Sequence, residues 1–191
     1  VITIFLRVPQ VLADGPERVV QTMTTSAGDK FGIWGDKPAS PAPTSFIFAT
    51  TIEGTLGDHY FRRAGTTLAE KGFLCVSIDL PCHGTDSRDG EPAQLTRWRH
   101  RCEAGEDFVD ATASRLSRVL DHLIAEGYTD PARVAVCGTS RGGFIALQFA
   151  ARDPRVHCVV AYAPVTDLLV LREFHGAESN KMAQSLNVLN Q

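Results

Sequence analysis

The sequence has no large excess of charge of either sign. Its 191 residues carry 19 lysines and arginines against 22 aspartates and glutamates, which gives a formal net charge of −3 and a pI near 6.1. Proteins that bind nucleic acid or an anionic membrane surface usually present a basic patch or a polybasic run. Neither is present, so we expect no nucleic-acid partner and no membrane partner.

Long apolar runs are missing as well. The longest have the length of a β-strand, far below the roughly 20 residues that a membrane-spanning helix needs. Residues 1–6 are too short for the apolar core of a secretory signal, and Arg7 and Pro9 follow them in place of a cleavage site. The default expectation is a cytoplasmic protein, although the sequence begins with Val1 and not with Met.

Cysteine pairs and metal-binding spacings are also lacking. The five cysteines contain no Cys-x-x-Cys pair, and Cys75, Cys137 and Cys158 lie inside apolar strand-like runs. We therefore expect reduced cysteines that behave as small buried hydrophobic residues. The six histidines show no His-Glu-x-x-His or comparable spacing, so no metal and no other cofactor is expected.

What the sequence does contain is typical of one globular domain. Hydrophobic residues make up 43% and charged residues 21%. A chain of this length can bury a sizeable core. We find no internal repeat, low-complexity tract or linker, so residues 1–191 are expected to form a single domain.

Strand-like and helix-like segments alternate along the chain. We predict a hairpin at residues 19–25 and 30–34, strands at 44–50, 73–80 and 156–163 and in the apolar run from 134, and helices at 59–71, 106–126, 141–152 and, broken near Gly176, 168–191. Such alternation is typical of parallel strands joined by crossover helices. The expected fold class is α/β, with a mostly parallel, doubly wound sheet.

A Gly-x-Ser-x-Gly pattern at Gly138, Ser140 and Gly142 lies between an apolar run and a helical segment. A strand that turns into a helix within a few residues holds its central side chain at a strained φ/ψ, and small neighbours avoid collisions with the backbone. The pattern is the sequence form of a nucleophile elbow, from which Ser140 would project. The alternative is a glycine-rich turn in which Ser140 only caps the helix. As a nucleophile, Ser140 would need a base, an acid and N–H donors for an oxyanion.

Further segments extend the pattern beyond the elbow. They are residues 79–84, 98–101 with 105–107, 138–143 and 163–168. Together with the order of the elements from Val19 onwards, they resemble the α/β-hydrolase fold, and most closely its prolyl oligopeptidase-like and dienelactone-hydrolase-like esterases. The resemblance implies that Ser140 is the nucleophile and that the N–H of Arg141 is one oxyanion donor. The second donor would lie in the loop at residues 51–57, with Thr51 or Ile52 as our placement.

The resemblance also implies an acid and a histidine that this sequence does not clearly supply. In the family, both follow strands later than the one after the elbow, and the chain ends at Gln191 before either would arrive. We therefore interpret it as the N-terminal and central part of a longer hydrolase, with the last strands of the sheet missing. The strand at residues 156–163 would then be an exposed apolar edge.

Two residues after the elbow could substitute for the missing pair. Asp167 is the candidate acid, because some α/β-hydrolases place the acid after this strand, and the alternative is that Asp167 caps the next helix. His175 is the candidate base, and the alternative is a solvated loop histidine. A helix would carry His175 about 12 Å from Asp167, at about 1.5 Å per residue. His83, in the turn at 81–84, is a third candidate that the fold would more ordinarily use structurally.

Two charged segments have a functional and a structural interpretation. The side chain of Arg141 could bind a carboxylate or carbonyl group of the substrate, or it could pair with Asp167, Asp79 or Glu53. The segment at residues 98–101 could bind substrate, but we expect it to hold its loop by stacking and ion pairs, with Glu106 or Asp107 as partner or helix cap.

The resulting hypothesis is a serine hydrolase that acts by acyl transfer through Ser140, on a small-molecule ester in preference to an amide or peptide. A peptidase of this resemblance would commonly carry an added propeller domain, and these 191 residues contain none, which is why an ester is favoured. The alternatives are a non-catalytic binding or partner module of the same fold and an acyltransferase. Assembly into a homo-oligomer stays open, and the identity of the substrate lies in loop shapes that sequence does not give.

Overall fold

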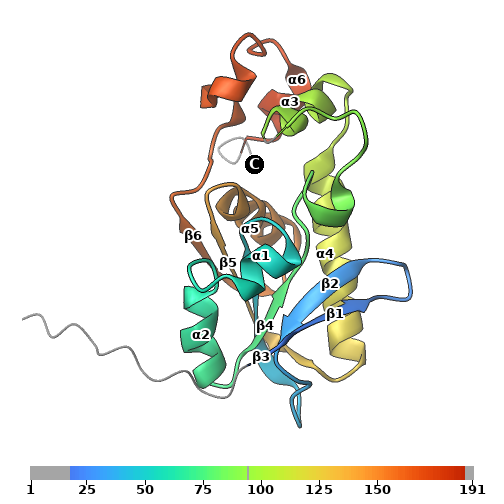
Figure 1. Cartoon of the computed structure of the whole chain (residues 1–191), viewed down its shortest axis with the longest axis vertical. Coiled ribbons are helices and arrows are strands. Elements are labelled where there is room, and N and C mark those ends of the chain that lie inside the picture. Colours follow the sequence, from blue (N-terminus) through green and yellow to red (C-terminus); the bar gives the residue numbers. More distant parts are fainter. Residues whose placement is uncertain (1–17, 94, 188–191) are drawn as a thin grey trace, which may run out of the picture.

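The computed structural model describes residues 18–93 and 95–187 (Figure 1). In this part of the chain the strands form one six-stranded sheet in the order β1-β2-β4-β3-β5-β6. Their bounds are β1 (Val20–Thr24), β2 (Lys30–Trp34), β3 (Ala42–Phe48), β4 (Leu74–Ser77), β5 (Thr129–Thr139) and β6 (Val156–Tyr162). β1, β2 and β4 pair antiparallel, whereas β4, β3, β5 and β6 run parallel. The predicted hairpin and the mostly parallel sheet are confirmed.

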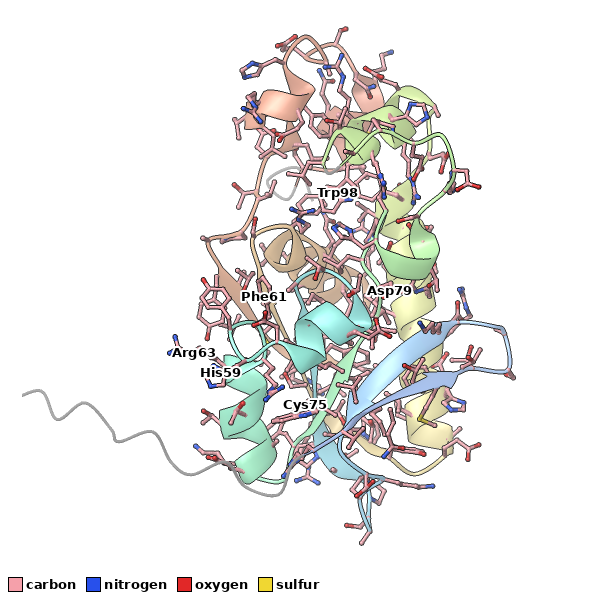
Figure 2. All side chains as sticks on the ribbon, viewed as in Figure 1. His59, Phe61, Arg63, Cys75, Asp79 and Trp98 are labelled. Carbon is pink, nitrogen blue, oxygen red and sulfur yellow. The ribbon has the colours of Figure 1, made fainter. Side chains whose placement is uncertain are left out.

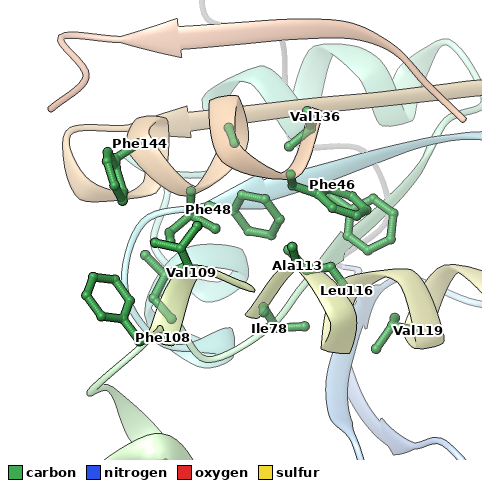
Figure 3. Packing of buried hydrophobic residues seen from close by; sticks show 14 of the residues in the cluster. Phe46, Phe48, Ile78, Phe108, Val109, Ala113, Leu116, Val119, Val136 and Phe144 are labelled. Carbon is green, nitrogen blue, oxygen red and sulfur yellow. The ribbon is translucent and has the colours of Figure 1, made fainter. Parts of the chain in front are cut away.

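Helices cover both faces of the sheet, as the doubly wound class requires. They are α1 (Ile52–Gly57), α2 (Arg63–Glu70), α4 (Phe108–Ala125) and α5 (Arg141–Arg152). Phe46 and Phe48 of β3 belong to the larger core with α4 and α5, whereas Ile47 belongs to the smaller core with α1 and α2. This two-residue period is what a strand buried on both faces produces. Figure 3 shows the larger core, with Ala113 and Leu116 of α4 close to Phe46.

Short helices lie beyond the carboxyl ends of the parallel strands. They are η1 (Gly84–Asp86), α3 (Thr96–Glu103), η2 (Leu168–Val170), η3 (Arg172–Phe174) and α6 (Lys181–Ser185). Figure 1 shows α3 and α6 side by side above the sheet, and the two helices are in contact. Among the described helices, none is long and apolar enough to span a membrane.

The structure corrects the prediction for three segments. The single helix predicted at residues 59–71 is α2 alone, and the loop predicted at 51–57 contains α1. The sequence does not predict α1, because this helix contains two glycines and glycine is a poor helix former. Burial of Ile52 and Leu56 stabilises α1, and it packs against Gly32 of β2, where a Cβ would lie 2.2 Å from the Ile52 side chain. α3 was expected as an ordered loop segment and is a helix.

β6 forms an edge of the described sheet, because it pairs with β5 alone. Val159, Val160 and Tyr162 are 38%, 42% and 53% exposed, which confirms the predicted apolar edge. All five cysteines are free, and four are buried. The prediction that Cys158 is buried is wrong, since it lies on this uncovered strand.

Candidate active site

Ser140 occupies the turn between β5 and α5, at the carboxyl edge of the parallel strands. The residue is exposed, and its φ of 54° and ψ of −114° lie in a region that a residue with a side chain rarely adopts. The backbone holds this conformation, because the N–H of Ser140 donates to the carbonyl of Tyr162 at 2.9 Å and its carbonyl accepts the N–H of Phe144. The Ser140 side chain makes no capping hydrogen bond to α5. The alternative in which Ser140 only caps the helix is therefore wrong.

Two glycines allow this tight turn. A Cβ on Gly138 would lie 2.1 Å from the carbonyl oxygen of Gly142, and a Cβ on Gly142 would lie 2.1 Å from the carbonyl oxygen of Phe48. Any side chain at these positions would have to displace backbone atoms. The glycines thus bring the first turn of α5 against the end of β3.

The loop after β3 carries Thr51 and Ile52, the two candidates for the second oxyanion donor. The Thr51 hydroxyl accepts the N–H of Gly54 at 2.9 Å and caps α1. The N–H of Ile52 donates to Oδ1 of Asp79 at 2.9 Å. In residues 18–93 and 95–187, the N–H groups of Thr51 and Arg141 have no hydrogen-bond partner. Of these two candidates, Thr51 has the N–H that is still available.

Asp79 is the buried residue that fixes this loop to the end of β4 (Figure 2). Besides Ile52, its carboxylate accepts the N–H and the hydroxyl of Thr85, at 2.9 and 2.8 Å. Burial alone would raise the pKa of Asp79, but the hydrogen bonds from Thr85 and Ile52 hold the pKa below its ordinary value. Gly84 has a φ of 51°, and a Cβ there would lie 2.4 Å from the Asp79 carboxyl group. Segment 79–84 therefore positions the loop that carries Thr51.

Arg141 extends from the elbow to the same turn. Its Nη1 lies 2.8 Å from Nε2 of His83. Within the described residues, no hydrogen bond or ion pair joins Arg141 to Asp167, Asp79 or Glu53, and Glu53 pairs with a lysine. The alternative in which Arg141 pairs with one of these acids is wrong, because the turn at residues 81–84 presents His83 to the guanidinium instead.

Trp98 secures that turn from α3, the structural role predicted for its segment. The side chain is fully buried, and its Nε1 donates to the carbonyl of Pro81 at 3.0 Å. Its ring packs 5.0 Å from the ring of Phe108 and 5.5 Å from that of Phe144. The turn and the first helix after the elbow thus share one buried aromatic cluster.

Arg101 completes the attachment of α3, with partners that differ from those predicted. Its buried guanidinium bonds to Asp86 at 2.6 Å and to Glu91 at 2.7 Å. Glu106 pairs with another arginine, so the prediction of Glu106 or Asp107 as the ion-pair partner is wrong. The prediction of a helix cap is confirmed, because the Asp107 carboxylate accepts an N–H of the first turn of α4.

Asp167 and His175 do not meet around Ser140 in the described structure. The Asp167 carboxylate accepts the N–H of Leu169 at 2.8 Å, which is the capping role weighed for it. His175 is exposed at the end of η3, where its carbonyl accepts a hydrogen bond from Arg99 at 2.8 Å. Neither side chain hydrogen-bonds to Ser140. The described residues thus assemble an elbow with the N–H groups of Arg141 and Thr51 free, and they do not assemble an acid–base pair.

A cavity of about 280 Å³ lies next to the elbow. Its walls come from α2, its preceding turn and the ends of three strands: Ile47, Phe48, Tyr60, Phe61, Arg63, Ala64, Cys137, Gly138, Thr139 and Tyr162. Its aromatic and aliphatic walls suit an apolar portion of a small molecule, and Arg63 and Thr139 add polar groups. In the described part of the chain, no three His, Cys, Asp or Glu side chains are grouped closely enough to hold a metal ion.

Comparison with known proteins decides the family. The sequence pattern of the prolyl oligopeptidase family matches residues 60–184, which include the elbow and more than half of the chain. The chain belongs to the prolyl oligopeptidase family. The matched segment of this family member also contains Asp79, His83 and Trp98, the residues that organise the turn after β4.

Two curated proteins are similar to this family member over part of their length. The quorum-quenching protein AidA of Acinetobacter baumannii is 36% identical over 106 residues, which are 53% of this chain and 31% of AidA. Hydrolase LUC6 of a Fusarium species is 32% identical over 114 residues, which are 58% of this chain and 23% of LUC6. The chain thus spans less than a third of the length of either relative.

Solved structures show the α/β-hydrolase fold. An acetyl xylan esterase from a Paenibacillus species has a TM-score of 0.57 at 15% identity, with 93% of this chain and 67% of that chain covered. Dipeptidyl peptidase 4 of Porphyromonas gingivalis has a TM-score of 0.57 at 19% identity, with 91% of this chain and 25% of that chain covered. At these identities the likeness establishes the fold and not the substrate.

Sequence reasoning missed two contacts at the site. The first is the bond from Ile52 to Asp79, for which the signal was the spacing of Asp79 and Gly84: only glycine fits beside a buried carboxylate there. The second is the bond from Arg141 to His83. Nothing in the sequence signals it, because the two residues are far apart in the chain and meet only when the turn closes over the elbow.

Proposed function

We propose that this protein is a serine hydrolase that cleaves esters through an acyl-enzyme on Ser140. The observation that carries the proposal is the backbone of Ser140, with positive φ on a non-glycine residue, exposed and free of a capping bond. Strain of this kind costs roughly 1–3 kcal/mol and persists only where the surroundings enforce it. Membership of the prolyl oligopeptidase family supports the same assignment.

The proposed oxyanion donors are the N–H groups of Arg141 and Thr51. Both residues leave the same edge of the sheet, because Phe48 pairs with Gly138 in parallel register and each strand ends within a few residues of that pair. Their N–H groups have no partner in the described structure, whereas that of Ile52 is bound to Asp79. Two donors aimed at a developing oxyanion are usually the largest electrostatic contribution to acyl transfer.

An ester is the substrate class that this site serves best. Cleavage of an amide requires that an acid protonate the leaving amine. An activated ester releases an alcohol or phenol with less assistance. The aromatic cavity beside Gly138 and Thr139 offers room for its apolar part.

The packing of the elbow favours a second candidate, a non-catalytic binding module that keeps the elbow for packing. The elbow glycines contact β3, so they have a packing role in either case. The two candidates differ in one property, which is whether the Ser140 hydroxyl reacts.

Turnover of 4-nitrophenyl acetate distinguishes these candidates. Ser140→Ala should abolish turnover, at least 100-fold below the starting protein, because an acyl-enzyme cannot form. The thermal midpoint should stay within a few degrees, since the side chain makes no bond to α5. Ser179→Ala, at an exposed serine near α6, is the matched control and should keep full turnover. Equal turnover in all three proteins would refute the assignment of Ser140, and turnover in none would favour the binding module.

A further inference from the structure

The guanidinium of Arg141 has an unusual environment for a partly buried charge. It follows the proposed nucleophile directly, and its only hydrogen bond to a described residue is the 2.8 Å contact with Nε2 of His83. A guanidinium has five N–H donors in a planar fork, so most of them are uncommitted here.

The partner of Arg141 is neutral. A guanidinium can only donate, so Nε2 of His83 accepts and carries no proton. Nδ1 of His83 then carries the proton and donates to the carbonyl of Pro81 at 2.9 Å. Burial lowers the pKa of His83 below its ordinary value, and the positive charge of Arg141 acts in the same direction. The bond to His83 therefore positions the guanidinium without neutralising it.

Two other arginines that are removed from solvent are neutralised by carboxylates, whereas Arg62 and Arg97 bond to carbonyl and hydroxyl oxygens of the described residues. Arg101 bonds to Asp86 and Glu91, and Arg155 bonds to Asp153 and Asp121. In contrast, no carboxylate of the described residues lies within 4.0 Å of the Arg141 guanidinium.

The uncompensated charge of Arg141 has an energetic consequence. Burial lowers the pKa of Arg141, and Glu173 opposes this only through a longer-range attraction. A desolvated guanidinium without a counter-charge favours binding of an anion, and its planar fork matches a carboxylate.

A chain of contacts fixes the direction of this guanidinium. Pro81 presents one carbonyl to both Nε1 of the fully buried Trp98 and Nδ1 of His83. His83 in turn accepts from Arg141. Since Trp98 also packs on Phe144, three residues after Arg141 in α5, the turn and the helix hold the two ends of the Arg141 contact in register.

We infer that the Arg141 side chain is a carboxylate-binding group, that His83 is its positioning residue, and that the preferred substrates are esters carrying a free carboxylate a few bonds from the scissile carbonyl. The part of this inference that concerns substrates rests on the proposed function. The binding of a carboxylate beside Ser140 is a separate claim that needs no turnover.

The binding test uses two probes of similar size on the Ser140→Ala protein: monomethyl glutarate, an ester with a carboxylate, and methyl pentanoate, a neutral ester. Their dissociation constants are measured by NMR titration. The glutarate probe should bind roughly 10-fold more tightly, as a charge-assisted hydrogen bond at a half-buried site permits. Arg141→Gln should abolish this preference, and Arg172→Gln, which removes an 88% exposed guanidinium, should keep it.

His83 is tested by loss and rescue. His83→Leu removes the acceptor, so it should lower the preference for the glutarate probe several-fold. His83→Gln offers a carbonyl oxygen to Arg141 and should restore part of it. A role of His83 in folding alone would affect binding of both probes equally and would not be rescued by glutamine.

Turnover separates the inference from the function on which it rests. The ratio of kcat/KM for the 4-nitrophenyl monoester of glutaric acid to that for 4-nitrophenyl pentanoate should fall about 10-fold in Arg141→Gln. Selective binding of the glutarate probe without any turnover would refute the hydrolase proposal and keep the carboxylate site. Turnover of both esters with an unchanged ratio in Arg141→Gln, or equal binding of both methyl ester probes, would overturn the carboxylate site.

Discussion

At the residue scale, the elbow depends on two glycines, because neither has a Cβ. Gly138 and Gly142 lie where a methyl group would collide with backbone oxygens 2.1 Å away, and Ser140 between them has a positive φ. The backbone around them is fixed from both sides by β6 and α5. The reactive geometry proposed for Ser140 is thus a consequence of backbone packing. Substitutions that disturb this packing should lower the free energy of unfolding.

Gly142→Ala should destabilise the protein by about 2–3 kcal/mol, because the new Cβ would meet the Phe48 carbonyl. Urea denaturation followed by circular dichroism measures this. Gly57→Ala is the matched control, since Gly57 ends α1 and a Cβ there meets nothing within 4 Å. The control should be neutral or stabilise by roughly 0.5 kcal/mol. Equal effects of the two substitutions would contradict the packing account.

At the element scale, Asp153 joins three elements at the amino end of the sheet. It ends α5, accepts a hydrogen bond from Ser117 of α4 at 2.7 Å, and pairs with Arg155, just before β6, at 2.6 Å. The hydrogen bond from Arg155 outweighs burial and, with that of Ser117, lowers the pKa of Asp153 from 3.8 to about 2.

Asp153→Asn should therefore lower the free energy of unfolding by about 2 kcal/mol at pH 7, from a pKa difference worth about 1.4 kcal/mol per unit. The folded pKa is depressed, so this stabilisation is present above the unfolded pKa near 3.8 and is lost as the pH falls towards 2. Denaturation curves of both proteins between pH 7 and 2 check this. A difference that stayed constant over that range would rule out ionisation of Asp153 as its source.

The elements also show what the sequence could predict. The strands, α4 and the elbow were predictable because apolar periodicity and glycine spacing are local signals, and Asp107 is a local cap. α1 was not, because tertiary burial of Ile52 and Leu56 outweighs its glycines. The partners of Arg141 and Arg101 were not predictable either, because several carboxylates were plausible in sequence and the closure of the turn at residues 81–84 decides between them.

At the scale of the whole molecule, β6 leaves unpaired backbone and apolar side chains at the edge of the described sheet. Exposed apolar edge strands promote pairing between chains. We therefore predict that the 191-residue chain self-associates in a concentration-dependent manner. Sedimentation velocity over a 100-fold range of concentration measures this.

Val160→Lys should shift this association towards the monomer, because a charge on an edge strand opposes pairing. Val170→Lys is the control: Val170 is 72% exposed but lies in η2, away from the strand edge. An equal shift in both variants would indicate a general effect of charge and would contradict pairing through β6.

The central claim is that Ser140 is a reactive nucleophile, and intact-mass spectrometry with a fluorophosphonate probe tests it most directly. The protein expressed from its complete coding sequence should gain the mass of one adduct, and Ser140→Ala should gain none. Absence of the adduct from the unsubstituted protein, or its persistence in Ser140→Ala, would contradict the claim.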